Sequence, residues 1–273
     1  MLLHDYKIRE GISRNEESSV SLTPVECHGG YLVKRDDLYE VAGSRGGKAR
    51  SCYSICSRGI EEGFKGFVTA GSRQSPQIQI ASFIAKEFGV PLKAHTPGGE
   101  ITEELKVAIA NGAEIVQEKA GYNGVIKARA RETADSLGWL YIPFGMQCEE
   151  AVIETGYQVK SLKKHDFNRL VVPVGSGMSL AGILRGLEYF DIYVPVLGVS
   201  VGANYEKVLD EWAPVWWRED SQVRIVKSPY SYSQYYENNK IGDLVVDPIY
   251  EAKCIDFLEE GDLLWVVGIR DGF

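Results

Sequence analysis

The chain of 273 residues is predicted to fold as an α/β protein with two parallel-sheet, three-layer domains. Short apolar segments alternate with longer segments of helical periodicity from Gly66 to Ser200, and turn residues separate them. Strands that alternate with helices of this length pair in parallel through right-handed crossovers. Hydrophobic residues make up 44% of the chain and charged residues 25%, so there is ample apolar material for a core.

The predicted elements follow one another in a regular order. Strands are expected over 66–70, 91–95, 114–117, 139–143, 169–174, 194–200 and 263–268. Helices are expected over 77–88, 100–111, 124–137, 148–164 and 179–190. The segment 212–239 is rich in Trp, Tyr and Ser, and we interpret it as loops over a pocket, with a surface interaction patch as the alternative. A smaller domain over 52–162 is expected to be inserted in a larger one that combines 1–51 with 163–273.

Charge and cysteine usage limit the classes of partner. The net charge of -8 argues against a general electrostatic hold on nucleic acid or on an anionic membrane, and no apolar run is long enough to span a bilayer. Without a signal peptide and with five scattered cysteines, a cytoplasmic protein with reduced thiols is expected. Cys52 and Cys56 share a helix face but have no histidine nearby, so core packing is favoured over zinc and no metal site is expected.

Lys48 follows two glycines and opens a predicted helix. The helix N-terminus disfavours an added positive charge there, and Arg45 and Arg50 act in the same direction, so the neutral and nucleophilic amine is favoured. The glycines Gly46 and Gly47 let the backbone approach a ligand closely. On this motif alone, a solvated lysine at a helix start is the more common outcome.

Two strand-to-helix turns offer sites for anions. Gly175–Gly182 follows an apolar strand, and its free backbone N–H groups and serine hydroxyls suit a phosphate, although glycines placed for packing are the alternative. Thr69–Gln77 offers hydroxyls, an amide and N–H groups to a carboxylate. The alternative for this second turn is a simple helix cap, with Ser75 at the N-cap and Pro76 at the first helical position.

These features occur in one order with three further motifs. The six stretches are Lys34-Arg35-Asp36-Asp37-Leu38, Gly46-Gly47-Lys48, Gln74-Ser75, Glu154-Thr155-Gly156-Tyr157, Gly175–Gly182 and Asp247–Lys253. Together they resemble the pyridoxal-phosphate enzymes of the tryptophan synthase β-subunit fold, or fold type II. The resemblance is greatest to the aminocyclopropane-carboxylate deaminase and D-cysteine desulfhydrase branch, and it covers most of the chain.

The resemblance implies roles for individual residues. Lys48 would be the Schiff-base lysine that holds pyridoxal 5'-phosphate and moves a proton at the substrate carbon. The residues implied to bind the cofactor phosphate are Gly175, Ser176, Gly177, Met178 and Ser179. Those implied to face the substrate carboxylate are Ser72, Arg73, Gln74, Ser75 and Gln77. The further catalytic candidates are Ser75, Tyr230 and Tyr232. A homodimer and a small amino-acid-type substrate are also implied.

Departures from the family pattern leave several functions open. Pro76 stands where the family has an Asn that bonds the cofactor's phenolic oxygen, Gly47 replaces the Asn before the lysine, and no partner for the pyridine nitrogen is identified at the altered end 268–273. We expect a deaminase or lyase acting on a small amino acid or amine. One alternative is an isomerase or decarboxylase acting on an aminoacyl-modified thymidine in hypermodified phage DNA, which the net charge disfavours. Another is a catalytically degenerate homologue that still binds the cofactor.

Overall fold

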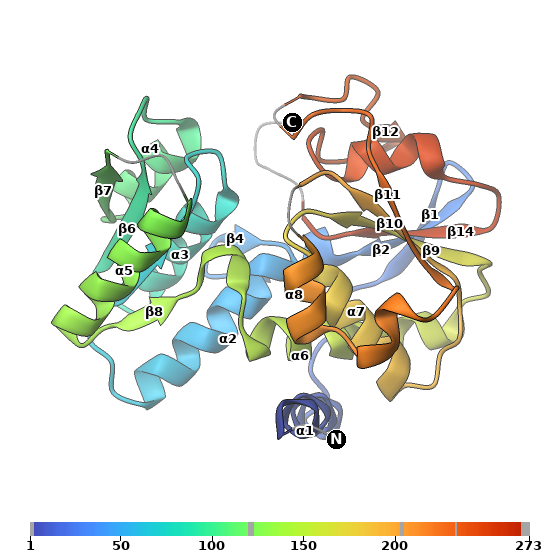
Figure 1. The fold of residues 1–273 in the computed structure, drawn as a ribbon, viewed down its shortest axis with the longest axis horizontal. Helices are drawn as coiled ribbons and strands as arrows, with labels where there is room; N and C mark the ends of the chain where they lie inside the picture. The colour runs from blue at the N-terminus through green and yellow to red at the C-terminus, as the bar shows by residue number, and fades with distance from the viewer. Residues whose placement is uncertain (1–2, 120–122, 203–204, 233, 269–273) are drawn as a thin grey trace. The chain divides into compact units, whose positions relative to one another are not determined.

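The computed structural model describes residues 3–119, 123–202, 205–232 and 234–268. The chain divides into two compact units (Figure 1). Unit 1 combines Met1–Tyr39 with Glu149–Phe273, and unit 2 is the continuous segment Glu40–Cys148. Each unit is built on its own sheet.

Unit 1 contains a six-stranded sheet in the order β1-β2-β14-β9-β10-β11. The strands are β1 (Val25–His28), β2 (Tyr31–Arg35), β9 (Arg169–Val174), β10 (Val196–Ser200), β11 (Val223–Lys227) and β14 (Asp262–Val266). Only the β1–β2 pair of this sheet is antiparallel. The strands β10 and β14 are buried along their whole length, as expected for parallel strands covered on both faces. Five of the strands therefore end at one edge of the sheet.

Helices α1 (Leu3–Glu17), α6 (Glu149–Gln158) and α7 (Met178–Tyr189) pack on one another in unit 1. A Cβ on Gly186 would lie 2.3 Å from the backbone oxygen of Gly156, so only glycine permits this approach of α6 to α7. Val33, Val171 and Leu264 belong to a core cluster that includes residues of the 3₁₀ helix η5 (Glu251–Phe257). The remaining elements of the unit are η1 (Asp36–Leu38), η3 (Val159–Lys164), α8 (Tyr205–Trp212), η4 (Val215–Arg218), β12 (Lys240–Ile241), β13 (Leu244–Val245) and η5 (Glu251–Phe257).

Unit 2 contains a four-stranded parallel sheet in the order β7-β6-β5-β8. Its strands are β5 (Phe67–Ala70), β6 (Leu92–Pro97), β7 (Glu114–Glu118) and β8 (Leu140–Ile142). Its helices are α2 (Gly47–Glu61), α3 (Pro76–Glu87), α4 (Glu103–Ala110) and α5 (Asn123–Leu137), and the short elements are β3 (Glu40–Val41), β4 (Ser44–Arg45) and η2 (Phe144–Met146). Val68 and Ala70 pack against Ile126 and Ala130 of α5, so the apolar stripe of this helix covers the sheet.

The predicted α/β class with two parallel sheets is confirmed. The elements expected over 66–200 are present to within a few residues, except that the helix expected over 148–164 ends at Gln158 and continues as the 3₁₀ helix η3. The interpretation of 212–239 as loops is wrong in part, because Val223–Lys227 forms a strand parallel to β10. This strand lies at the sheet edge and exposes Arg224 and Lys227, which weakens its apolar signal.

The division into units differs from the predicted domains. The chain passes from unit 1 to unit 2 before Glu40 rather than at 52, because α2 packs on α3 and β8 of unit 2. The chain returns to unit 1 before Glu149 rather than at 163, because α6 packs on α7 and α1 of unit 1. A helical sequence pattern does not specify which sheet the helix covers. Lys48 consequently belongs to the smaller unit.

The five cysteines are all free thiols, and Cys52 and Cys56 are buried on α2, as the helix-face prediction required. Cys27 is the exposed one. Across the residues that the structure describes, no helix is both long and apolar enough to cross a membrane.

Candidate active site

Lys48 is the second residue of α2, in the first turn that the sequence predicted. The N-cap Gly46 has φ 90°, a left-handed conformation that favours glycine. Its carbonyl accepts from Ala49 N at 3.0 Å and Arg50 N at 3.3 Å, which starts the helix. Gly46 and Gly47 are buried, whereas Lys48 is half-buried. The amine therefore lies at a positive helix end with partial access to solvent.

The turn from Gly71 to Ser75 connects β5 to α3 in the same unit. Gly71 N donates to His95 O at 3.1 Å, and Ser75 N donates to Ser72 O at 3.0 Å. Ser75 is the N-cap of α3, where its hydroxyl accepts from Gln77 N at 3.3 Å, and Pro76 follows in the first helical position. The helix-cap interpretation is thus confirmed for Ser75. Ser72 and Ser75 are half-buried and Gln74 is exposed, so their side chains remain accessible.

Gln77 differs from its neighbours in this turn because it is buried and its amide is fully engaged. Its Nε2 lies 3.0 Å from Thr69 Oγ1, 3.2 Å from Ala70 O and 2.8 Å from Pro143 O. Its Oε1 accepts from Gly145 N at 2.7 Å. The amide thus connects the end of β5 to the residues that follow β8. In the structure the Gln77 amide supports the turn through these bonds, and its expected contact with the substrate carboxylate stays a prediction.

The turn after β9 lies at the edge of the unit 1 sheet where the parallel strands end. Gly177, with φ 96°, is the N-cap of α7, and Ala181 N donates to its carbonyl at 2.9 Å. The amides that precede Ala181 in the first turn have no acceptor within the helix. A Cβ on Gly177 would lie 3.2 Å from Tyr205 O, and one on Gly175 would lie 2.9 Å from Tyr250 Cε1. The glycines therefore let Tyr205 and Tyr250 pack closely on the turn, and the backbone N–H groups, which no described side chain caps, form a cradle that would suit a phosphate.

Tyr250 lies beside this cradle and was not identified from the sequence. Its ring approaches Gly175, and its hydroxyl lies 2.9 Å from the hydroxyl of Tyr232. The two tyrosine rings are 5.9 Å apart at 75°. Asp247 Oδ1 fixes the segment by accepting from Ile249 N at 2.8 Å and Tyr250 N at 3.0 Å. Tyr250 thus connects Tyr232 to the phosphate-type turn. In the sequence, only the Asp247–Lys253 motif indicated Tyr250.

Tyr230 has different neighbours from Tyr232. Its hydroxyl donates to Asp256 Oδ2 at 3.3 Å, and Asp256 Oδ1 accepts from Tyr236. The rings of Tyr230 and Tyr236 meet edge to face at 4.9 Å. The hydrogen bond to Asp256 raises the pKa of Tyr236 well above its ordinary value. The structure therefore pairs Tyr230 with a carboxylate instead of bringing it to the cradle.

Glu251 follows Tyr250 and is almost completely buried. Its Oε1 accepts from Val267 N at 2.9 Å, directly after β14, and its Oε2 has no hydrogen-bond partner among the described residues. Burial and then the charge of Asp247 raise the pKa of Glu251 to about 8. A buried carboxyl oxygen without a partner fits a cationic or N–H-bearing ligand group. Sequence reasoning had identified no partner for a pyridine nitrogen, because the contact with Val267 cannot be read from the local pattern.

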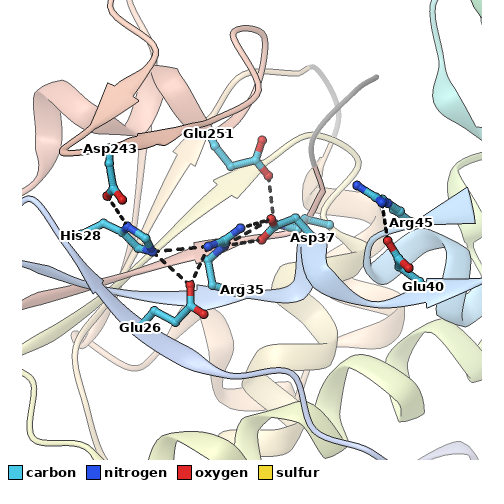
Figure 2. Close-up of polar contacts among 9 residues, drawn as sticks. Glu26, His28, Arg35, Asp37, Glu40, Arg45, Asp243 and Glu251 are labelled. Carbon is cyan, nitrogen blue, oxygen red and sulfur yellow. Dashed lines mark hydrogen bonds and ion pairs between the residues drawn. The ribbon is translucent and has the colours of Figure 1, made fainter. Parts of the chain in front are cut away.

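The Arg35 and Asp37 of the early motif belong to a charged network at the end of β2 (Figure 2). The Arg35 guanidinium donates to Asp37 twice, from Nε to Oδ1 at 2.9 Å and from Nη2 to Oδ2 at 2.7 Å. Its Nη1 donates to Glu26 at 2.6 Å. His28 lies between Glu26 at 3.0 Å and Asp243 at 2.7 Å. Hydrogen bonds to Asp243 and then Glu26 raise the pKa of His28. The network therefore links β1 and the end of β2 to Asp243.

Comparisons with known proteins agree with these features. A family model described as pyridoxal-phosphate dependent enzyme matches residues 20–235. A Thermotoga maritima protein that bears the provisional name 1-aminocyclopropane-1-carboxylate deaminase is 29% identical over 256 residues, covering 81% of this chain and 80% of its own.

Two solved structures show the same fold. An ACC deaminase homologue has a TM-score of 0.77 at 20% identity, with 91% of this chain and 89% of that chain covered. Threonine deaminase isoform 2 from Solanum lycopersicum has a TM-score of 0.69 at 15% identity, with 98% and 85% covered.

Proposed function

The chain belongs to the pyridoxal-phosphate dependent enzyme family, and from that premise we propose that it deaminates or cleaves a small amino acid or amine held through Lys48. The observation that carries the proposal is the cradle at the start of α7, with Tyr250 and the unpartnered oxygen of Glu251 at the same sheet edge. Phosphate, aromatic ring and ring nitrogen are the three parts of pyridoxal phosphate that a protein has to hold, and unit 1 offers a group for each.

The cofactor phosphate would be held by the turn after β9. The backbone amides and hydroxyls proposed for this purpose come from Gly175, Ser176, Gly177, Met178 and Ser179. Bound there, pyridoxal phosphate supplies an electron sink for negative charge at the substrate carbon. The Glu251 carboxyl would hold the proton at the ring nitrogen, which relieves the cost of its buried, unpartnered oxygen.

Unit 2 would supply the lysine and the groups for the substrate carboxylate. Lys48 would anchor the cofactor and move a proton at the substrate carbon, and its place in the first turn of α2 favours the neutral amine. Ser72, Gln74 and Ser75 would bind the carboxylate. Ser75, whose hydroxyl accepts from Gln77 N, would also be a candidate acid or base.

The tyrosine pair is the second proposed proton-handling group. The hydroxyls of Tyr232 and Tyr250 share one hydrogen bond, so a proton held by one can pass to the other. Tyr230 is left out of this proposal because its hydroxyl donates to Asp256. Pro76 has no N–H and no side-chain donor, so the oxygen of the cofactor ring would receive no hydrogen bond from that position.

Cofactor binding tests the first half of the proposal. The full-length protein mixed with pyridoxal 5'-phosphate is expected to develop the visible absorbance band of a lysine-bound cofactor. Lys48→Ala should lose the band, while Lys65→Ala, which replaces an exposed lysine of the same unit, should keep it. A wild-type protein without the band at saturating cofactor, or a Lys48→Ala variant that retains it, contradicts the proposal.

Ammonia release tests the second half. 1-Aminocyclopropane-1-carboxylate, threonine and serine are the first probes, since the compared structures include an ACC deaminase homologue, a threonine deaminase and a serine racemase. We expect release of ammonia with at least one small amino acid and its loss in Lys48→Ala. If the cofactor band forms but no amino acid yields ammonia or changes the band, the chain is a cofactor-binding homologue without this activity.

A further inference from the structure

Arg73 is a cation in the turn that we assign to the substrate carboxylate. Its neighbours Ser72, Gln74 and Ser75 already offer neutral donors, as a single carboxylate at a helix start requires. Arg73 is half-buried, although it lies in an otherwise short surface turn. A charged side chain kept partly out of water in this position needs a physical reason.

Arg73 occupies a defined position against Gly99, Glu100 and Thr102, which together form its seat. Its Nη1 donates to Glu100 O at 3.1 Å, and its backbone oxygen accepts from Thr102 Oγ1 at 2.6 Å. A Cβ on Gly99 would lie 2.7 Å from Arg73 Cζ, and Gly99 has φ +147°, so this glycine makes room for the planar group. The side chain is therefore held against Gly99 and Glu100. Little rotamer freedom remains to be lost when a ligand binds.

The seat of Arg73 provides a carbonyl but no opposite charge. Among the residues that the structure describes, no carboxylate forms an ion pair with Arg73. Three other arginines of unit 2 do lie against a glutamate, namely Arg45 with Glu40 (Figure 2), Arg58 with Glu62 and Arg129 with Glu132. A guanidinium has five N–H donors in a planar fork, and among the described residues only Glu100 O accepts from the Arg73 side chain. The free edge of the fork matches a carboxylate.

We propose that Arg73 selects amino acids whose side chain carries a second carboxylate. This inference rests on the proposed function and names the substrate class of the same site. The neutral donors of the turn bind the carboxylate next to the amine, and Arg73 binds the distal one, because its guanidinium is held at Glu100 O whereas the Ser75 hydroxyl is held at Gln77 N. Arg73 is then a specificity-determining residue, and an acidic substrate supplies the counter-charge that unit 2 does not.

Matched pairs of acidic amino acids and amides test the proposal without requiring turnover. The full-length protein with pyridoxal 5'-phosphate is titrated with aspartate against asparagine, and with glutamate against glutamine, in both enantiomers, while the cofactor band is followed. We expect the acid of at least one pair to bind roughly tenfold more tightly than its amide, the magnitude of a charge-assisted hydrogen bond. Arg73→Met should remove that difference, and Arg73→Lys should keep part of it.

Arg129→Met is the matched control, because Arg129 is an exposed arginine of the same unit that pairs with Glu132. It should keep the preference for the acid. If Arg73→Met does not fold, as judged by circular dichroism, Arg73→Gln deletes the charge and can still donate to Glu100 O. Equal binding of acid and amide by the wild type overturns the inference, as does a preference that survives loss of the Arg73 charge.

The two proposals fail in different ways. A protein that forms the cofactor band but responds to none of the acidic probes overturns the assignment of Arg73 and leaves cofactor binding intact. A protein that forms no band overturns the proposed function itself.

Discussion

The turn after β9 in unit 1 and the turn after β5 in unit 2 have the same local architecture and use it in opposite ways. Both join the end of a parallel strand to the start of a helix. Gly177 caps α7 with its backbone alone, whereas Ser75 caps α3 with a hydroxyl that accepts from Gln77 N. At the start of α7 no described side chain accepts from the backbone N–H groups, which leaves them to a ligand. At the start of α3 the Ser75 hydroxyl accepts from one of these groups. The N-cap residue thus separates a turn that binds by its backbone from one that must bind by its side chains.

Gln77→Leu is expected to have the largest effect, because the unit 2 turn depends on one buried amide. The change leaves Gly145 N and the carbonyls of Ala70 and Pro143 without their partner, at a cost on the order of 3 kcal/mol in the free energy of unfolding. Urea unfolding measures it. Gln74→Leu makes the same change at an exposed position of the same turn and should cost less than about 0.5 kcal/mol. Equal losses in the two variants would show that the amide network is unimportant.

Gly177→Ala should weaken cofactor binding in unit 1 as well as stability. Alanine in the left-handed conformation costs roughly 1–2 kcal/mol, and its Cβ would lie 3.2 Å from Tyr205 O. Displacing the cradle should raise the apparent Kd for pyridoxal phosphate about tenfold or more, measured from the absorbance band. Gly63→Ala is the control, since Gly63 has φ +93° with no atom within 4 Å of the added Cβ. It should share the loss of stability and keep the cofactor affinity. Equal affinities for both variants would contradict the assignment of the cradle.

Ser75→Ala is expected to remove the side-chain cap of α3. Loss of the hydrogen bond from Gln77 N should cost about 1 kcal/mol, and Ser75→Asn should recover most of it because Asn is also a good N-cap. Thermal unfolding of the three proteins measures the difference. The contrast between the two turns also requires that Ser75→Ala keep its cofactor affinity within about twofold. A loss comparable to that of Gly177→Ala would mean that both turns contact the phosphate.

His28→Gln should have the smallest effect, and one that depends on pH. The pKa of His28 is raised by Asp243 and Glu26, so its contribution to stability is fully present below the unfolded pKa of about 6.5 and is lost as pH rises through the folded pKa. The difference in urea midpoint between wild type and variant should therefore shrink from about pH 6 to about pH 9. His165→Gln, outside this network, serves as the control. A difference that stays constant across this range would exclude His28 as the titrating group.

Apolar runs were sufficient to predict the inner strands β9, β10 and β14 of unit 1 and β5 and β6 of unit 2, whereas the inner strand β2 was not predicted. Parallel strands such as β9 and β10 are buried on both faces, so their sequences are nearly continuous apolar segments. β11 was missed because an edge strand with exposed charges lacks that signal. The helix α1 was also missed, although Ile8 and Ile12 are completely buried.

The glycine turns and Lys48 could be placed from the sequence because their signals are local. Tyr250 and Glu251 could not be placed, since their positions depend on contacts with Gly175 and Val267, which lie on other segments of the chain. The same reason explains Gln77, whose partners Pro143 and Gly145 follow a different strand. Sequence patterns report the periodicity of a segment, whereas these roles are set by the strand order of the sheets.

The position of β14 has a consequence for synthesis on the ribosome. This strand, Asp262–Val266, pairs with β2 on one side and β9 on the other. Until it emerges, both neighbours keep an unpaired edge and the sheet of unit 1 stays in two parts, whereas unit 2 is encoded by one uninterrupted segment. In a nascent chain, unit 2 would then fold before unit 1, whose sheet is completed only by β14. Lys48 would be in its folded position before the phosphate cradle of unit 1 is stable.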